Sequence, residues 1–208
     1  MLQKIAIASA IFVFALGILF TSVLRTAAVR YETSGVKSTS VLGTTDYNID
    51  YNLAYPGKIL PDSFLWPLKA LRDKVWLLIT TDKLQKVELK ILFADKRIGG
   101  AVILFENNKN EIALSTATKA EKYLEEASLG EEQLRLDGKE PSIDVLQRLA
   151  YASLKHYEIL LSLENEVPDD MKATIISVQQ IPIKAYERAR NALLSKGVEP
   201  PNNPFKWE

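Results

Sequence analysis

Apolar residues recur at every third or fourth position along most of the chain beyond residue 66, which is the spacing of amphipathic helices that pack around a shared core. The clearest case follows Thr81-Asp82, a pair that favours a helix N-cap. There the spacing persists through Leu84, Val87, Ile91, Ala94, Ile98, Ala101 and Phe105. This run predicts a long helix that ends in the polar turn at residues 107–110.

The same periodicity predicts four further helices, at about 67–79, at 111–136, from Ser142 onward and at 169–195, with Gly197 as the last C-cap. Short turns separate them, and no alternating pattern typical of a strand competes. We therefore predict an all-α fold, with an antiparallel helical bundle over residues 59–197. It has about four long helices, and the short first helix packs on one end.

Two features interrupt this regularity. Gly99-Gly100 lies inside the second predicted helix, where each glycine costs roughly 1 kcal/mol relative to alanine. Either a neighbouring helix approaches closely there or the helix bends. Pro182 lies inside the last helix and predicts a kink, because proline removes one backbone hydrogen bond.

A structural motif of Pro61, Asp62, Trp66 and Pro67 marks the start of the bundle. Pro67 suits the first turn of a helix, where its missing N–H removes no bond. We expect Trp66 and the two residues before it, Phe64 and Leu65, to fold back as a hydrophobic plug on the end of the bundle. The apolar stripe of the helix that follows is expected to face the core; it consists of Leu68, Leu71, Val75 and Leu78.

The N-terminal region predicts a membrane anchor. Residues 5–24 form a run of twenty without a charge, bracketed by Lys4 and Arg25, and about 30 Å of helix would span the hydrocarbon core of a bilayer. Residues 1–4 would then be a short cytoplasmic head. The alternative is a signal peptide that is cleaved near Ala28, which would release a secreted protein.

Residues 25–58 are rich in Ser, Thr, Gly, Tyr and Asn and predict a flexible tether. A second interpretation treats its alternating tyrosines as a recognition strand. The tail, residues 198–208, contains three prolines that keep it extended and the apolar residues Phe205 and Trp207. These two residues either dock on their own bundle or bind a partner.

Composition narrows the possible functions. The chain is 47% apolar and 25% charged, as in globular proteins, and it contains no cysteine. Lys4, Arg25 and Arg30 precede the first acidic residue, which leaves 23 basic residues against 26 acidic ones beyond residue 30. This balance argues against binding of nucleic acid, which requires a basic face.

The candidate chemical groups are few. His156 is the single histidine, and Ser153 lies three residues before it, but the surrounding sequence has no nucleophile-elbow motif. Acidic pairs at 125–126, 131–132 and 169–170 are expected on solvated helix faces rather than in a cleft. The sequence therefore predicts no catalytic, metal-binding or cofactor-binding residues.

Several local motifs resemble a known family: Leu60-Pro61-Asp62-Ser63, Trp66-Pro67-Leu68-Lys69, Thr81-Asp82, Lys86, Leu89 and Ala94-Asp95-Lys96-Arg97. Over roughly residues 56–130 the chain resembles bacterial domain-of-unknown-function family 5667, although Trp66 stands where tyrosine is expected. The resemblance implies a single-pass or secreted protein with a helical extracytoplasmic domain, and it implies no catalytic chemistry.

Taken together, these features predict a single-pass protein of the bacterial cell membrane whose C-terminal helical domain is extracytoplasmic. Its anchor contacts the lipid bilayer, and its domain binds a protein or another envelope component without catalysis. The alternative is an envelope stress or ligand sensor, or a chaperone-like helical bundle.

Overall fold

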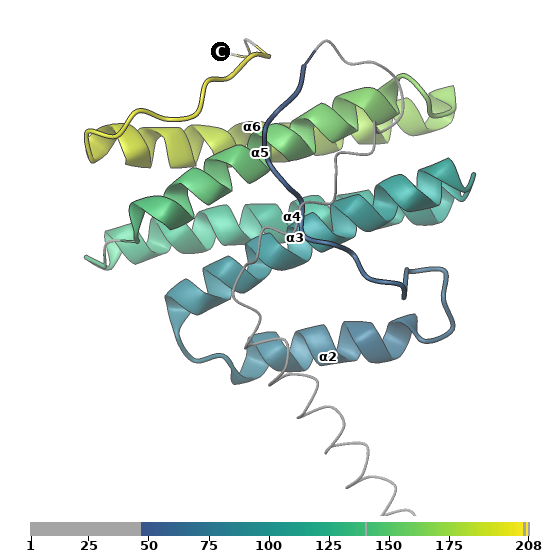
Figure 1. Cartoon of the computed structure of the whole chain (residues 1–208), viewed down its shortest axis with the longest axis horizontal. Helices are drawn as coiled ribbons and strands as arrows, with labels where there is room; N and C mark the ends of the chain where they lie inside the picture. Colours follow the sequence, from purple (N-terminus) through teal and green to yellow (C-terminus); the bar gives the residue numbers. More distant parts are fainter. Residues whose placement is uncertain (1–46, 140, 206, 208) are drawn as a thin grey trace, which may run out of the picture.

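The computed structural model describes residues 47–139, 141–205 and 207, and within them the fold is all-α (Figure 1). The helices are α2 (Trp66–Ile79), α3 (Lys83–Glu106), α4 (Asn110–Leu136), α5 (Ile143–Glu164) and α6 (Asp169–Ser195). The predicted all-helical fold is confirmed, and the helix bounds that were predicted agree with these to within a residue or two; no end was predicted for α5.

Local chemistry explains where the helices begin and end. The Asp82 carboxylate accepts a hydrogen bond from the Gln85 N–H at 2.8 Å, and Ser142 Oγ accepts one from the Val145 N–H at 3.4 Å. Each side chain thereby satisfies a backbone donor that has no partner within its helix. Gly197, one residue beyond the C-cap Lys196 of α6, has a φ of 69°, the left-handed conformation that glycine adopts at this position.

The core lies between two helical hairpins. α3 packs along α4 and α5 along α6, while α4 also contacts α6 and α3 contacts α5. The apolar run of α3 faces inward as predicted, since Ile91 and Ile98 are fully buried. Alanines on α4 allow α3 to approach closely, because Ala113, Ala117, Ala120 and Ala127 are also buried. Pro182 is buried within α6, and the kink expected there stays a prediction.

The orientation of α2 differs from the prediction. This helix lies at the edge of the bundle beside α3, the one helix it contacts among the described residues (Figure 1). Leu68, Leu71 and Leu78 do not face the core but are 61%, 51% and 80% exposed. The buried residues of α2 are Trp76 and Asp73. Trp76 packs edge-on against Phe93 of α3, with ring centroids 5.9 Å apart. The burial of this large aromatic ring determines which side of α2 faces the bundle.

The predicted hydrophobic plug is also wrong for two of its three residues. Phe64 is 95% exposed and Leu65 is 46% exposed. Trp66 is half-buried, and its ring lies beneath the Lys69 ammonium and the Arg97 guanidinium, at 5.2 and 5.3 Å from the ring centroid. Cation–π contacts of this kind hold an aromatic ring at a surface without full burial.

The segment at residues 47–58 forms part of the folded unit. It runs in extended form across the helices (Figure 1, dark blue), and Ile49 contributes to the main core cluster. Pro56 is buried over Gly99 and Gly100, so the close neighbour at this glycine pair is an extended segment rather than a helix. The rest of the predicted tether, residues 25–46, lies outside the described residues.

The predicted anchor at residues 5–24 also lies outside the described residues. Among the helices that the structure does describe, none combines the length and the apolar character needed to cross a membrane.

Candidate functional site

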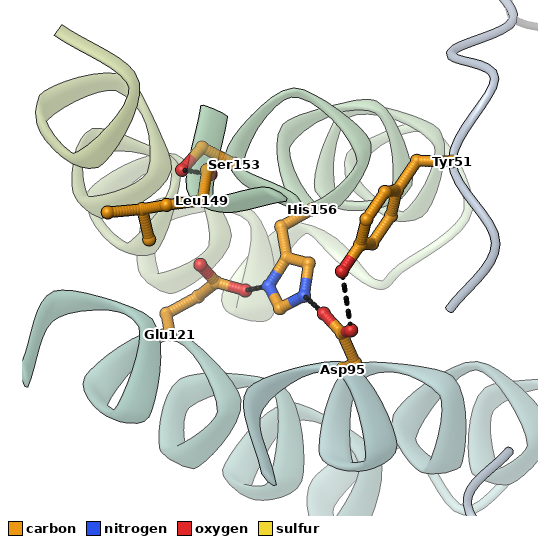
Figure 2. A network of polar contacts seen from close by, with 6 residues as sticks. All are labelled: Tyr51, Asp95, Glu121, Leu149, Ser153 and His156. Carbon is orange, nitrogen blue, oxygen red and sulfur yellow. Dashed lines mark hydrogen bonds and ion pairs between the residues drawn. The ribbon is translucent and has the colours of Figure 1, made fainter. Parts of the chain in front are cut away.

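A network of ionisable side chains occupies the interior of the bundle. His156 of α5 lies between two carboxylates, with Nδ1 2.7 Å from Glu121 Oε1 and Nε2 3.2 Å from Asp95 Oδ1 (Figure 2). The Tyr51 hydroxyl donates to the other oxygen of Asp95, Oδ2, at 2.7 Å. Three helices and the segment at residues 47–58 thus meet at one buried point.

The geometry fixes the charge of the imidazole. Burial by itself lowers the pKa of His156, but the Glu121 charge and the hydrogen bonds to Asp95 and Glu121 outweigh it and raise the pKa to about 9. Both ring nitrogens face carboxylate oxygens, which only accept hydrogen bonds, so both carry a proton. His156 is therefore an imidazolium ion at neutral pH, held between Glu121 and Asp95.

A second ion pair joins the same extended segment to α5. The Ile49 N–H donates to Glu158 Oε2 at 2.7 Å, and the Lys155 ammonium donates to the other oxygen, Oε1, at 2.7 Å. Ile49 is thereby attached to α5, and Tyr51, two residues further along, is attached to α3. The extended segment is fixed at its backbone and at a side chain.

A third cluster connects α2 to the bundle through a cation. The Arg97 guanidinium lies between two aromatic rings, 5.3 Å from the Trp66 centroid and 4.8 Å from the Tyr123 centroid. Tyr123 also contacts Phe93 edge-on at 5.9 Å. Trp66, the motif residue expected in the plug, is therefore placed by Arg97 rather than by the core.

The remaining motif residues make surface contacts. Asp62 forms an ion pair with Lys109 at 2.5 Å, which joins the start of the bundle to the turn before α4. Pro67 is exposed in the first turn of α2, as expected, and Pro61 is half-buried.

The histidine–serine pair considered from sequence does not form. Ser153 Oγ donates to the Leu149 carbonyl at 2.7 Å, while the imidazole points toward the carboxylates (Figure 2). His156 is fully buried, so its ring nitrogens have no access to solvent. A shallow hollow of about 410 Å³ lies on the surface between α4 and α6, and its lining includes no member of the network.

The acidic pairs are spread over the structure. Glu126 pairs with Lys90, Glu132 with Arg188 and Asp169 with Lys172. Glu131 differs from the expected solvated position, because it is fully buried and bonded to Arg135 at 2.8 Å. Within the described part of the chain, no group of three or more histidine and acidic side chains is arranged to hold a metal ion.

The tail lies against its own bundle. Phe205 and Trp207 stack on each other with centroids 5.0 Å apart and planes 5° apart, and both rings contact Tyr157 of α5. The Tyr186 hydroxyl donates to the Pro201 carbonyl at 2.6 Å. Of the two alternatives for the tail, the structure shows docking on the bundle. Binding of a partner by Phe205 and Trp207 stays a prediction.

Sequence reasoning missed the partners of His156, although a signal was present. Glu121 lies four residues after Ala117 and three before Leu124, so it occupies the apolar face of α4. Asp95 follows Ala94 directly in the seam of α3. Acidic residues on the inward faces of two helices, together with a single histidine on a third, indicate a buried ion network.

These features define a class: an all-helical bundle domain whose ionisable groups are enclosed in its core and attach an extended N-terminal segment. A family model, Domain of unknown function (DUF5667), matches residues 58–170, and the chain belongs to this family. The match confirms the resemblance, whose range already included Asp95 and Glu121, and extends it beyond residue 130 to include His156. No curated protein and no solved structure matches the chain.

Proposed function

We propose that this chain is a membrane-tethered, extracytoplasmic helical module of the bacterial cell envelope. It binds a protein or another envelope component and carries out no catalysis. One contrast carries the proposal: the ionisable groups are enclosed in the core, whereas large apolar side chains of α2 face outward. This is the arrangement of a binding module rather than of an active site.

The absence of catalysis is supported by the state of His156. A general base needs a free nitrogen within reach of the substrate, whereas both nitrogens here contact carboxylates inside a closed core. With a pKa of about 9, the imidazole stays protonated at neutral pH and does not accept a proton. Its contacts support a structural role.

The membrane anchor is supported by the sequence of residues 5–24. Twenty residues without a charge, flanked by Lys4 and Arg25, have the length and composition of a transmembrane helix. The short head with one basic residue has the layout of a signal-anchor segment, and this layout favours an extracytoplasmic C-terminal domain, although the count of basic residues on the two flanks by itself does not.

Single-cysteine labelling tests the membrane anchor and the side of the membrane on which the domain lies, because the chain has no cysteine of its own. Thr118→Cys introduces a thiol at an exposed position on α4, and Ala120→Cys is the matched buried control. In intact spheroplasts a membrane-impermeant maleimide should label Thr118→Cys and leave Ala120→Cys unlabelled. Deletion of residues 5–24 should move the protein from the membrane to the soluble fraction. Labelling of Thr118→Cys only after lysis would contradict the orientation.

The exposed apolar side chains of α2 are also compatible with a chaperone-like bundle, the alternative function. In that case the full chain should suppress the aggregation of a denatured client protein, and Leu68→Glu with Leu78→Glu should abolish the effect. A binding module for a folded partner or an envelope component should leave the aggregation unchanged.

A further inference from the structure

The outer face of α2 is an apolar surface that no described element covers. We define it by six large side chains with exposed fractions between 46% and 95%: Leu68, Leu71, Leu78 and Ile79 of the helix, and Phe64 and Leu65 directly before it. Single exposed apolar residues are normal on protein surfaces, but a row of them along one side of a helix marks an interaction site.

The opposite side of α2 holds this face outward. Trp76 packs on Phe93, and the ring of Trp66 receives the Arg97 guanidinium. The Lys69 ammonium donates to two carbonyls of the preceding segment, those of Pro56 and Ile59. These contacts lie on the inner side of the helix and fix its rotation. The exposure of the outer face is therefore a property of the folded domain.

We propose that the outer face of α2 lies on the surface of the lipid bilayer, as an amphipathic helix parallel to the membrane plane. This inference rests on the proposed function, since it names the envelope component that the module contacts. Four apolar side chains on one side of the helix, together with Phe64 and Leu65 directly before it, suit insertion at the boundary between headgroups and acyl chains.

One charge of α2 suits the same surface. Lys69 lies on the inner side of the helix, where its ammonium donates to the Pro56 and Ile59 carbonyls. Asp73 is buried and bonded to Arg72 at 2.7 Å, so neither of these two residues presents a full charge to a membrane. Lys74 is exposed beside the apolar row, and a basic residue in this position strengthens binding to anionic lipids.

The length of the connecting chain keeps the domain near the bilayer. Twenty-two residues, 25–46, separate the predicted anchor from Tyr47, where the described chain begins. The sequence predicts a flexible tether here, and a flexible chain of this length has an average end-to-end distance of about 25 Å. A domain held at this distance meets the membrane surface far more often than it meets a partner in solution.

Fluorescent labelling of single cysteines in the full chain tests the proposal. Phe64→Cys and Leu78→Cys place an environment-sensitive dye on the outer face, and Ile176→Cys places it on α6. Ile176 is a matched control because it is an aliphatic residue with 47% exposure on a helix that does not contact α2. The proteins are reconstituted into vesicles of phosphatidylethanolamine and phosphatidylglycerol, with and without lipids that carry a quencher.

If α2 lies on the bilayer, dyes at residues 64 and 78 shift their emission to the blue and are quenched by the lipid-borne quencher. The dye at residue 176 is quenched by iodide in the water. Leu71→Glu should reduce the lipid quenching at residue 78 without changing the thermal midpoint, because Leu71 is already 51% exposed. Quenching of all three dyes by iodide would overturn the proposal. Protection of residues 64 and 78 from both quenchers would also overturn it, since another part of the chain or a second copy would then cover the face.

A dye at Phe14→Cys separates this inference from the proposed function. Lipid quenching at residue 14 together with iodide quenching at residues 64 and 78 would retain the anchor and reject the outer-face contact. Iodide quenching at residue 14 would reject the anchor, and the dyes on α2 would still decide whether the face binds lipid by itself.

Discussion

His156 is a buried cation that depends on its neighbours for its charge. Glu121 and Asp95 are as completely buried as the imidazole, with exposed fractions of 0% and 1%. Replacing such a network by apolar residues is often neutral or stabilising, whereas the loss of one partner leaves an uncompensated buried charge. The network also contributes to specificity, because the Asp95 carboxylate that contacts His156 accepts the hydrogen bond from the Tyr51 hydroxyl.

The first prediction concerns the titration of this histidine. The folded pKa of about 9 lies above the ordinary value of 6.5. The stability that the imidazolium contributes, roughly 3 kcal/mol by linkage, is therefore fully present below pH 6.5 and is lost as the pH rises through about 9. Because the chain has one histidine, NMR of the untagged protein in detergent micelles can follow its ring protons without assignment by mutation. A midpoint at or below pH 6.5 would show that the carboxylates do not hold the proton.

Direct observation of the ring is preferable to a melting curve against pH. Burial, opposed by the nearby Asp73 charge, lowers the pKa of Lys69 to about 8. The folded state therefore loses this proton before the unfolded state does, and stability rises with pH over an overlapping range. His156 and Lys69 therefore change the free energy of unfolding in opposite directions as the pH rises, and the NMR signal of the histidine ring reports on His156 alone.

At the scale of single residues, the sequence predicted the buried apolar faces of the helices but not the ion network around His156. Periodicity places Ile91 and Ile98 in the core because apolar residues at helical spacing have few alternatives. It does not show which residues on other helices meet His156, because that depends on how far each helix slides along its neighbour. The partners are 35 and 61 residues away in sequence.

At the scale of elements, helix positions were predictable and the rotation of α2 was not. Caps and spacing define where a helix begins and ends, whereas rotation depends on which side offers the better contacts. In α2 the spacing of the leucines predicts that their side of the helix faces the core. The contacts of Trp76 with Phe93 and of Trp66 with two cations instead turn the opposite side toward the bundle. Leu68, Leu71 and Leu78, which the sequence placed in the core, are exposed, and Val75 is half-buried.

The second prediction concerns the glycines of α3 and α4. A Cβ added at Gly99 or Gly100 would lie 3.7 Å from Pro56 or 3.5 Å from Leu60, which is ordinary contact. Gly99→Ala and Gly100→Ala should therefore each stabilise the protein by about 0.5–1 kcal/mol through helix propensity. Gly130 is the matched control, because its added Cβ would lie 3.2 Å from Val87, a buried and β-branched neighbour.

Chemical denaturation of the three alanine variants under identical conditions measures the effect. Gly99→Ala and Gly100→Ala should raise the free energy of unfolding, and Gly130→Ala should gain less or lose stability. If both variants at 99 and 100 were destabilised, the extended segment would lie closer to α3 than the structure shows, and only glycine would fit beneath it.

At the scale of the whole molecule, the two ends of the described chain lie together on α5. Tyr47, at the beginning, contacts Phe205 in the tail edge-on with centroids 4.9 Å apart. Tyr157 of α5 supports Phe205 from the bundle at 4.8 Å. The sequence indicated that the tail was apolar but not where it docked, because the aromatic residues that receive it come from three distant parts of the chain.

The last prediction is that these two ends stabilise each other. Phe205→Ala should lower the free energy of unfolding by about 1–3 kcal/mol, less than for a fully buried ring, because Phe205 keeps partial exposure. Phe64→Ala is the same substitution at a residue with 95% exposure and should change stability by less than about 0.5 kcal/mol. In a double-mutant cycle, Tyr47→Ala and Phe205→Ala should show a coupling energy of about 0.5–1.5 kcal/mol, the range for an aromatic pair. Urea unfolding of the four proteins gives each free energy. Strict additivity would mean that the ends dock on α5 independently, and equal effects at residues 205 and 64 would mean that the tail leaves the bundle in solution.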